Sequence, residues 1–236
     1  MARSTAATPL IPRDDERGYV KLQTIPYRAH MLLAEAVLRN TSEGDHIFEG
    51  GVSAGYFARV LVEHGRRVDG ADIDGAAAES ARAVCDHVIV GDLQTLEPDD
   101  LPRDYDVLLF GDTLEHLPDP PALLRKLKLR LRPGGKLIAS VPNVANWSIR
   151  LGLMFGRFRY TDRGILDRTH LRFYTERTLN EMLNEGGFRI SEIKGSVPVP
   201  LVSDERLCRY AHRIGNLWPS LFAYSFIVVA NPAGDH

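Results

Sequence analysis

Three apolar segments in the first half of the chain each end at, or just before, an acidic residue. The side chains of these acids could bind a polar ligand. Glu49 ends the first segment and precedes a glycine-rich stretch, Gly50 to Gly55, while Asp72 and Asp92 follow the next two segments. A glycine-rich turn between a strand and a helix is where an open α/β sheet places a cofactor. An acid about 20 residues after such a turn commonly binds a ribose diol. We therefore predict a cofactor site at these strand ends, with Asp72 on the ribose.

The segments that would position these acids alternate between strand and helix patterns. Strand patterns occupy residues 46–49, 68–74, 87–90, 105–110, 136–141, 188–193 and 222–229. Helix patterns occupy residues 26–39 and 176–183, and a polar linker with Arg206, Arg209 and Arg213 precedes the last strand. Strands alternating with helices indicate an α/β fold, with a doubly wound, mostly parallel sheet and helices on both faces. The acids at the strand ends would then meet at one edge of that sheet.

The glycine-rich stretch also fits two other motifs. Gly51 to Gly55 matches G-x-S-x-G, the nucleophile turn of α/β-hydrolases, with Ser53 as the nucleophile. That turn normally follows several strands, whereas this one follows the first strand pattern of the chain, so a serine hydrolase is a remote alternative. A nicotinamide-binding sheet requires G-x-G-x-x-G, and Gly50, Gly51 and Gly55 lack that spacing.

Residues 49–55 resemble the motif D-x-G-x-G-x-G, with Glu49, Gly51, Ser53 and Gly55 in its four slots. Glu49 stands where the motif usually has Asp and is a longer acid in the same role. Ser53 stands where the motif has Gly, and we expect its backbone to keep an ordinary angle where glycine would be free.

Three later motifs complete a resemblance to class I S-adenosylmethionine-dependent methyltransferases over residues 45–145. Asp72 falls on their ribose-binding acid, Asp92 and Leu93 fall on the adenine-contacting position, and residues 131–135 fall on the turn after a helix. Residues 112–118 resemble the D-v-L-E-H-l-p segment of a branch that modifies small molecules and glycans. The resemblance implies a seven-stranded sheet with an antiparallel last strand, S-adenosylmethionine as the donor and S-adenosylhomocysteine as the product.

The chemistry of that donor indicates further residues of the site. Ile73 and Leu93 adjoin the predicted ligand acids and are the expected adenine walls, and Asp112 joins the cofactor residues. If the acceptor is a hydroxyl, His116 is the first candidate base, because it follows the fourth strand and histidine titrates near neutral pH. Glu115 beside it is expected to orient a neighbour or form an ion pair. A histidine bonded to the backbone at a helix start is the alternative for His116.

Residues 143–174 are expected to form an acceptor-side lid inserted after the fifth strand. Within it, one apolar face of a helix at residues 147–160 would comprise Trp147, Leu151, Met154, Phe155 and Phe158. This face would cover the acceptor or pair with a second copy in a homodimer. Its arginines make a membrane surface conceivable, but we do not favour one.

The second part of this lid carries charged groups in close succession. Residues 162–175 resemble the g-i-l-D-r-t-H-l-r-f-f-t segment of the same branch, which makes His170 the second candidate base. Arg168 and Arg172 would bind an acidic group of the acceptor through forked hydrogen bonds. Ion pairs of Asp167 with these arginines are the alternative. The predicted substrate-binding residues are Tyr27, Asn143, Arg168 and Arg172.

Composition limits the classes of function. With 236 residues, of which 44% are hydrophobic, the chain can form one core, so we predict a tail at residues 1–17 and a methyltransferase domain at 18–236. A net charge of −2 argues against a nucleic-acid acceptor. Cys85 and Cys208 cannot form a disulfide framework, and no Cys/His group has zinc spacing, so no metal is expected. No signal-peptide or membrane-spanning pattern is present, which favours the cytoplasm.

Together these patterns predict an O-methyltransferase that methylates a small molecule, such as a sugar or secondary metabolite. Transfer would be an in-line displacement in which positioning supplies much of the catalysis, with a histidine as general base. N- or C-methylation remains open. So does a scaffold that binds the cofactor without turning it over, in which Glu49 and Ser53 mark a decayed site.

Overall fold

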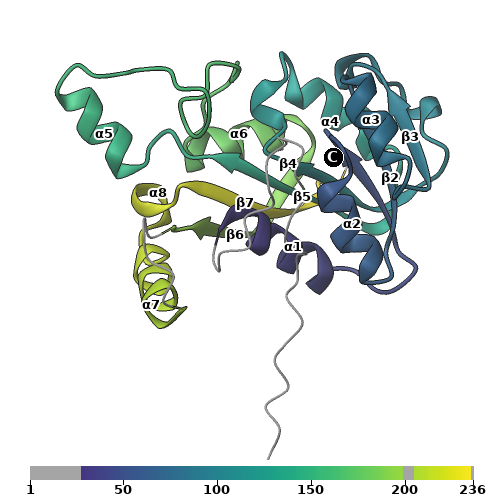
Figure 1. Cartoon of the computed structure of the whole chain (residues 1–236), viewed down its shortest axis with the longest axis horizontal. Helices are drawn as coiled ribbons and strands as arrows, with labels where there is room; N and C mark the ends of the chain where they lie inside the picture. The colour runs from purple at the N-terminus through teal and green to yellow at the C-terminus, as the bar shows by residue number, and fades with distance from the viewer. Residues whose placement is uncertain (1–27, 199–204, 235–236) are drawn as a thin grey trace, which may run out of the picture.

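The computed structural model describes residues 28–198 and 205–234. They form a seven-stranded sheet of order β3-β2-β1-β4-β5-β7-β6 with helices on both faces (Figure 1). The strands are β1 (His46–Gly50), β2 (Arg67–Asp72), β3 (His87–Val90), β4 (Tyr105–Gly111), β5 (Leu131–Pro142), β6 (Phe188–Ser196) and β7 (Ser225–Pro232). Strands β1 to β5 pair in parallel, and β7 runs antiparallel to β5 and β6. The predicted doubly wound, mostly parallel sheet is confirmed.

The helices and short helical turns connect these strands in chain order. They are α1 (Ala29–Arg39), α2 (Tyr56–Glu63), α3 (Gly75–Ala81), η1 (Leu93–Thr95), η2 (Pro98–Asp100), η3 (Leu114–His116), α4 (Pro120–Lys128), α5 (Trp147–Met154), α6 (Glu176–Glu185), α7 (Glu205–Gly215) and α8 (Pro219–Phe222). Thr175 begins α6, as predicted, because its hydroxyl accepts a hydrogen bond from the Thr178 N–H.

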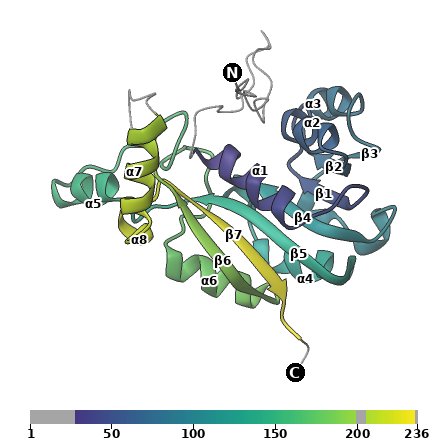
Figure 2. The same cartoon turned by 90° about the horizontal axis from the view of Figure 1, so that it is seen from below.

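The core lies on both faces of the sheet, as expected of parallel strands covered by helices. Phe48 of β1 contributes to one apolar cluster with Leu123 of α4 and Leu183 of α6. Its neighbour Ile47 contributes to the other cluster, together with Leu33 of α1. Figure 2 shows α1 on one side of the sheet and α4 and α6 on the other.

Strand β1 marks the point where the strand order reverses, because β2 lies on one side of it and β4 on the other. Gly50 at the end of β1 is level with Ala71 of β2 and Phe110 of β4. The loops that leave these three strands therefore start beside one another. Open α/β sheets bind their ligands at the carboxyl ends of the strands beside such a point.

Several predicted boundaries are wrong, among them the last strand, expected over residues 222–229, which is β7 at Ser225–Pro232 and follows helix α8. Strand β5 begins at Leu131, so the turn expected at residues 131–135 is the irregular start of this strand, where its register with β4 shifts. The helix expected over residues 147–160 ends at Met154, and Gly156 follows it with a φ of +65°. The polar linker expected around Arg206 is instead helix α7, whose Cys208 provides a buried side that the polar composition concealed.

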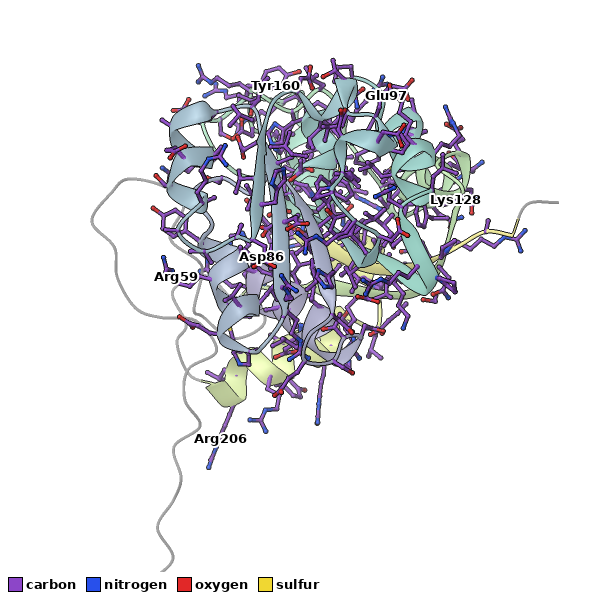
Figure 3. All side chains as sticks on the ribbon, turned by 90° about the vertical axis from the view of Figure 1, so that its right-hand side faces the viewer. Arg59, Asp86, Glu97, Lys128, Tyr160 and Arg206 are labelled. Atoms are coloured by element: carbon purple, nitrogen blue, oxygen red, sulfur yellow. The ribbon has the colours of Figure 1, made fainter. Side chains whose placement is uncertain are left out.

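In Figure 3 the labelled Tyr160, in the segment after α5, lies at the top and the labelled Arg206 of helix α7 lies at the bottom. Helix α7 lies outside residues 143–174, the range of the predicted lid. The predicted tail at residues 1–17 and the predicted substrate residue Tyr27 lie outside the described residues. Among the described helices, none has both the length and the apolar character needed to cross a membrane.

Candidate functional site

The glycine-rich loop after β1 is pressed against the loop after β4. Gly51 has a φ of +79°, and a Cβ atom on it would lie 2.6 Å from Thr113 Oγ1. The Thr113 hydroxyl in turn lies 3.0 Å from the Gly50 carbonyl oxygen and 3.1 Å from the Gly111 carbonyl oxygen, either of which can accept its proton. Only glycine combines this φ with so close an approach. Thr113, which the sequence analysis missed, thus joins the two loops.

Ser53 in the same loop has a φ of +49°, so the expectation that it keeps an ordinary backbone angle is wrong. Its N–H donates to Asp72 Oδ2 at 2.7 Å, which stabilises the unusual conformation. Asp112 after β4 has the same φ of +49°. Left-handed non-glycine residues cost about 1–3 kcal/mol and cluster at functional sites. The strain here falls on two of the predicted cofactor residues.

Ser140 of β5 fixes Asp112. The Ser140 hydroxyl donates to Asp112 Oδ1 at 2.8 Å, and the Asp112 N–H lies 3.1 Å from the Ser140 carbonyl oxygen. His30 of α1 approaches from the other side, with Nε2 3.9 Å from Asp112 Oδ2. Sequence reasoning missed Ser140 and His30, although a serine inside an apolar strand pattern was a usable signal. Asp112 therefore has Oδ1 bonded to Ser140 and Oδ2 turned towards His30.

Glu49 ends β1 with a buried side chain, 5% exposed, and its Oε2 atom has no hydrogen-bond partner among the described residues. Burial, followed by the nearby Asp72 carboxylate, raises the pKa of Glu49 to about 8. A buried carboxyl group without a partner is unfavourable unless a ligand supplies a donor or a positive charge. Glu49 is therefore a buried carboxyl group that a donor or a positive charge on a ligand could satisfy.

The other predicted cofactor residues lie around the ends of β2 and β3. Asp72 accepts hydrogen bonds from the N–H groups of Ser53 and Asp74, so its carboxylate also holds the loop. Asp92 accepts a hydrogen bond from the Gln94 N–H and so caps the start of η1. Ile73 is 73% exposed and free to contact a ligand, whereas Leu93 is buried in the core.

Gly55 begins α2 with a φ of +79°, and a Cβ atom there would lie 3.1 Å from the Ala81 Cα atom. The third glycine-motif position thus requires glycine for both its backbone angle and its contact with α3. Both predicted motif glycines, Gly51 and Gly55, consequently have a steric reason for their identity.

Glu115, His116 and His170 form a second group, on η3 and the loop before α6. The His116 and His170 rings lie 4.8 Å apart in an edge-to-face arrangement. His170 Nε2 lies 3.9 Å from Glu115 Oε1. The N–H groups of Leu171 and Arg172 donate to the Glu115 carbonyl oxygen at 2.9 and 3.0 Å, which brings the two segments together. The structure therefore unites both candidate bases, far apart in the sequence, around Glu115.

Burial controls the protonation of this group. Glu115 is 1% exposed, and burial, with Asp112 as the next cause, raises its pKa well above the ordinary value. Burial also lowers the pKa of His170, and the neighbouring His116 adds to that effect. His170 is thus held in its neutral form at neutral pH, as a proton acceptor must be.

The predicted substrate residues differ from one another in exposure and in hydrogen-bond partners. Arg168 pairs with Asp162 at 2.7 Å, not with Asp167, and is 63% exposed. Arg172 donates to the Pro118 carbonyl oxygen. Asn143 is fully buried, and its amide bonds the carbonyl oxygens of Ser220 and Ala223. The enclosed side chain of Asn143 thus fixes the chain after β5, and the substrate contact predicted for it stays a prediction.

Helix α5 has no buried residue, and in Figure 1 it stands away from the sheet. Its apolar side chains and those just after it are exposed to solvent: Trp147, Leu151, Leu153, Met154, Phe155, Phe158 and Tyr160. Exposed apolar groups gathered in this way mark a surface that binds a ligand or a partner.

Comparison with known proteins adds the family context. Residues 25–193 match the model of a family described as a methyltransferase domain. The ubiquinone biosynthesis O-methyltransferase of Coxiella burnetii is 26% identical over 178 residues, which cover 72% of this chain and 74% of that protein. A probable S-adenosylmethionine-dependent methyltransferase of Mycolicibacterium smegmatis is 29% identical over 171 residues, covering 72% and 61% respectively.

Solved structures share the fold. The magnesium protoporphyrin IX methyltransferase of Synechocystis, crystallised with bound S-adenosylhomocysteine, superposes with a TM-score of 0.59 at 18% identity and covers 87% of this chain and 82% of that one. An S-adenosylmethionine-dependent methyltransferase of Mesorhizobium loti gives a TM-score of 0.59 at 20% identity, covering 86% and 97%.

Proposed function

This chain belongs to the S-adenosylmethionine-dependent methyltransferases, and we propose that it methylates a hydroxyl oxygen of a small molecule. The observation that carries the proposal is the pair of histidines beside the cofactor loops. His116 and His170 each have Nδ1 3.2 Å from a backbone carbonyl oxygen, of Thr169 and Ile165 respectively. A carbonyl oxygen only accepts, so Nδ1 carries the proton and Nε2 presents a lone pair. Such a lone pair suits removal of a hydroxyl proton.

The residues present fit the cofactor. Glu49, with its unpartnered buried carboxyl oxygen, would hold the ammonium group of S-adenosylmethionine. Asp72 would bind the ribose with the lone pairs that Ser53 and Asp74 leave free. The proposed cofactor-binding residues are Glu49, Gly51, Ser53, Gly55, Asp72, Ile73, Asp92, Leu93 and Asp112. When bound, the cofactor supplies a methyl group on a positively charged sulfur, ready for displacement.

The chain's own residues would then hold the acceptor and accept its proton. His116 is the proposed base, with His170 as the second candidate, since both Nε2 atoms are unblocked by the backbone. The acceptor would lie under the segment 143–174, against the exposed apolar side chains around α5. Arg168 and Arg172 lie on the same segment and would meet an acidic group on the acceptor.

The small-molecule class rests on chemistry and on relatives. The net charge of −2 provides no field for nucleic acid, and the Coxiella burnetii relative is named an O-methyltransferase of ubiquinone biosynthesis. A sugar or a secondary metabolite with a hydroxyl is therefore the proposed acceptor, and the cytoplasm is the proposed compartment. Transfer to nitrogen or carbon is the alternative for the acceptor atom. A homodimer through residues 147–160 is the alternative use of the apolar surface.

Calorimetric titration tests the cofactor part of the proposal first. The purified protein should bind S-adenosylmethionine and S-adenosylhomocysteine with micromolar affinity, about −8 kcal/mol, and should not bind NAD. Absence of binding by all three would refute the methyltransferase and favour either the serine hydrolase with Ser53 or a scaffold whose decayed site no longer binds the cofactor.

Transfer of labelled methyl groups to a panel of hydroxylated and amine acceptors then tests the reaction. His116→Ala should lower turnover by roughly 10²- to 10⁴-fold, the usual contribution of a general base, and leave cofactor affinity unchanged. His64→Ala, which removes a histidine at the end of α2, is the control. Full turnover of His116→Ala would transfer the proposed role to His170, and labelling of amines alone would refute O-methylation.

A further inference from the structure

We propose that Glu115, His116 and His170 form a binding site for a divalent transition-metal ion. Each residue offers one ligand atom, and these atoms all lie within 4.8 Å of one another. Atoms bound to one ion at about 2.0–2.2 Å each would be separated by less than this, so a small inward movement completes the site. No local spacing of Cys and His residues predicts this metal site, because the group forms only when the loop before α6 folds onto η3.

The two histidines are already oriented as metal ligands usually are. Metal-bound histidine almost always donates its other ring N–H to a carbonyl or carboxylate oxygen, which fixes the ring and its tautomer. His116 Nδ1 faces the Thr169 carbonyl oxygen and His170 Nδ1 faces the Ile165 carbonyl oxygen, each at 3.2 Å. Both Nε2 atoms therefore carry a free lone pair.

Glu115 supplies an independent observation. Its side chain is 1% exposed, and neither carboxyl oxygen has a hydrogen-bond partner among the described residues. Buried polar groups are nearly always satisfied, and one that is not commonly indicates an ion or water that completes the site. The nearest basic group is His170, whose Nε2 lies 3.9 Å from Oε1, beyond hydrogen-bond distance. An ion between these groups would satisfy the carboxylate.

The donor set indicates which ion would bind. Two imidazole nitrogens and one carboxylate oxygen suit Zn²⁺ or Fe²⁺, whereas Mg²⁺ and Ca²⁺ prefer sites made of oxygen ligands alone. Three protein ligands leave at least one coordination position open, as in catalytic zinc sites. His116 is the most exposed of the three residues, so the open position can face solvent and an acceptor.

The catalytic consequence rests on the proposed function, whereas metal binding does not. An ion here would bind the hydroxyl oxygen of the acceptor and lower its pKa, as zinc does for water. The O–H bond would break with both electrons left on oxygen and the proton passed to solvent. That oxygen would attack the methyl carbon while the carbon–sulfur bond breaks, and both electrons of that bond would stay on the sulfur of S-adenosylhomocysteine, the leaving group. In the metal-bound enzyme both Nε2 atoms are occupied, so the ion replaces the histidine base.

Calorimetry with Zn²⁺ on the full, metal-stripped chain tests the site without reference to turnover. We expect one Zn²⁺ per chain, no comparable binding of Mg²⁺, and a visible absorption band when Co²⁺ replaces Zn²⁺. His116→Ala should weaken Zn²⁺ binding by roughly 100-fold or more. Removing only a residue that hydrogen-bonds to a metal ligand already lowers metal affinity by about 10- to 100-fold, and this variant removes a ligand itself. His64→Ala is the matched control, since the His64 ring also bonds a backbone carbonyl oxygen, of Val60, but belongs to no such group.

Three results would overturn the site: no stoichiometric Zn²⁺ binding by the folded protein, unchanged affinity in His116→Ala, or equal losses in His116→Ala and His64→Ala. Glu115→Gln, which keeps the side-chain shape, provides a second variant, and His116→Ala decides the matter if Glu115→Gln does not fold. S-adenosylmethionine affinity measured on the same samples separates the two proposals. Zn²⁺ binding without cofactor binding refutes the function alone, and the converse refutes the metal site alone.

Discussion

The loops after β1, β2 and β4, which we propose bind the cofactor and call the cofactor loops, lie at the same edge of the sheet as residues 143–174, the proposed acceptor-side segment, but the two regions are held in different ways. Around the cofactor loops, side chains such as Asp72, Thr113 and Ser140 bond to the backbone or to one another. In the acceptor-side segment, α5 buries none of its residues. One region is fixed without its ligand, and the other leaves apolar surface for a ligand to cover.

This difference matches the two ligands. The donor is the same in every reaction of the family, so its loops can be fixed in advance, even at the expense of the strained backbone at Ser53 and Asp112. Fixing a site in advance removes the ordering cost from binding. The acceptor differs between family members, so its side of the site can change without disturbing the sheet.

The largest effect is expected from a substitution at Gly51, where the loop after β1 approaches Thr113 most closely. Gly51→Ala places a Cβ atom only 2.6 Å from Thr113 Oγ1, at a φ that disfavours side chains. We expect a loss of about 2–4 kcal/mol in the free energy of unfolding, the sum of strain and displacement, and at least a roughly 100-fold loss of S-adenosylmethionine affinity. Urea unfolding and calorimetry measure the two effects.

Gly44→Ala is the matched control for Gly51→Ala. Gly44 also has a positive φ, +85°, but nothing lies within 4 Å of its Cβ position. It should therefore lose only about 1 kcal/mol from backbone strain and bind the cofactor normally. Equal losses in the two variants would mean that backbone angle, and not the approach of Thr113, explains Gly51.

Asp72→Ala should have the next largest effect, because it removes the acceptor of the Ser53 N–H and the proposed ribose ligand. Loss of hydrogen bonds to a charged group predicts about 1.5–3 kcal/mol of cofactor binding. Asp74→Ala is the control, since Asp74 caps α3 through the N–H groups of Ala76 and Ala77. It should reduce stability by about 0.5–2 kcal/mol and leave calorimetric affinity unchanged; unchanged affinity in Asp72→Ala would exclude Asp72 from the site.

The same contrast explains what could be predicted from the sequence. The loops after β1 and β2 are encoded locally, so a glycine turn and an acid at the end of the next strand were enough to predict Glu49, Gly51 and Asp72 as cofactor residues. The sheet followed from alternating strand and helix patterns. Thr113 escaped notice because its role depends on contact with Gly51, which no local pattern records.

The acceptor side depends on contacts between distant segments, and there the predictions were weaker. Asn143 was expected to touch substrate because it follows β5, but the return of the chain at Ser220 and Ala223 encloses it. The grouping of Glu115 with His170 likewise arises from the folding of the loop before α6 onto η3. Neither arrangement can be read from residue spacing.

A smaller effect is expected on the pH dependence of the free energy of unfolding, through the protonation of Glu49. Its pKa of about 8 lies above the unfolded value of 4.5, so between these values the folded state holds a proton that the unfolded state has lost. Stability from this group is complete at pH values below 4.5 and falls as pH rises towards 8, by at most about 1.4 kcal/mol per pH unit. Glu49→Gln should remove this decline in urea unfolding measured across that range.

Cofactor binding gives an independent check on Glu49. A cationic ammonium group requires the carboxylate, so binding near pH 7 should release a proton from Glu49. Calorimetry in buffers of different ionisation enthalpy detects that proton, and Glu49→Gln should abolish the release while weakening binding. A wild-type protein that releases no proton would show that Glu49 is already charged or does not meet the ammonium group.

The smallest expected effect tests the loosely held region. Met154 on α5 is 79% exposed, so Met154→Ser should change the free energy of unfolding by less than about 0.5 kcal/mol and leave cofactor affinity unchanged. If the apolar surface around α5 covers the acceptor, the variant should raise the KM for acceptor. Leu217→Ser, at an equally exposed apolar residue between α7 and α8, should alter none of the three quantities. A KM unchanged in Met154→Ser, with loss of a dimer in sedimentation, would instead assign this surface to a second copy of the chain.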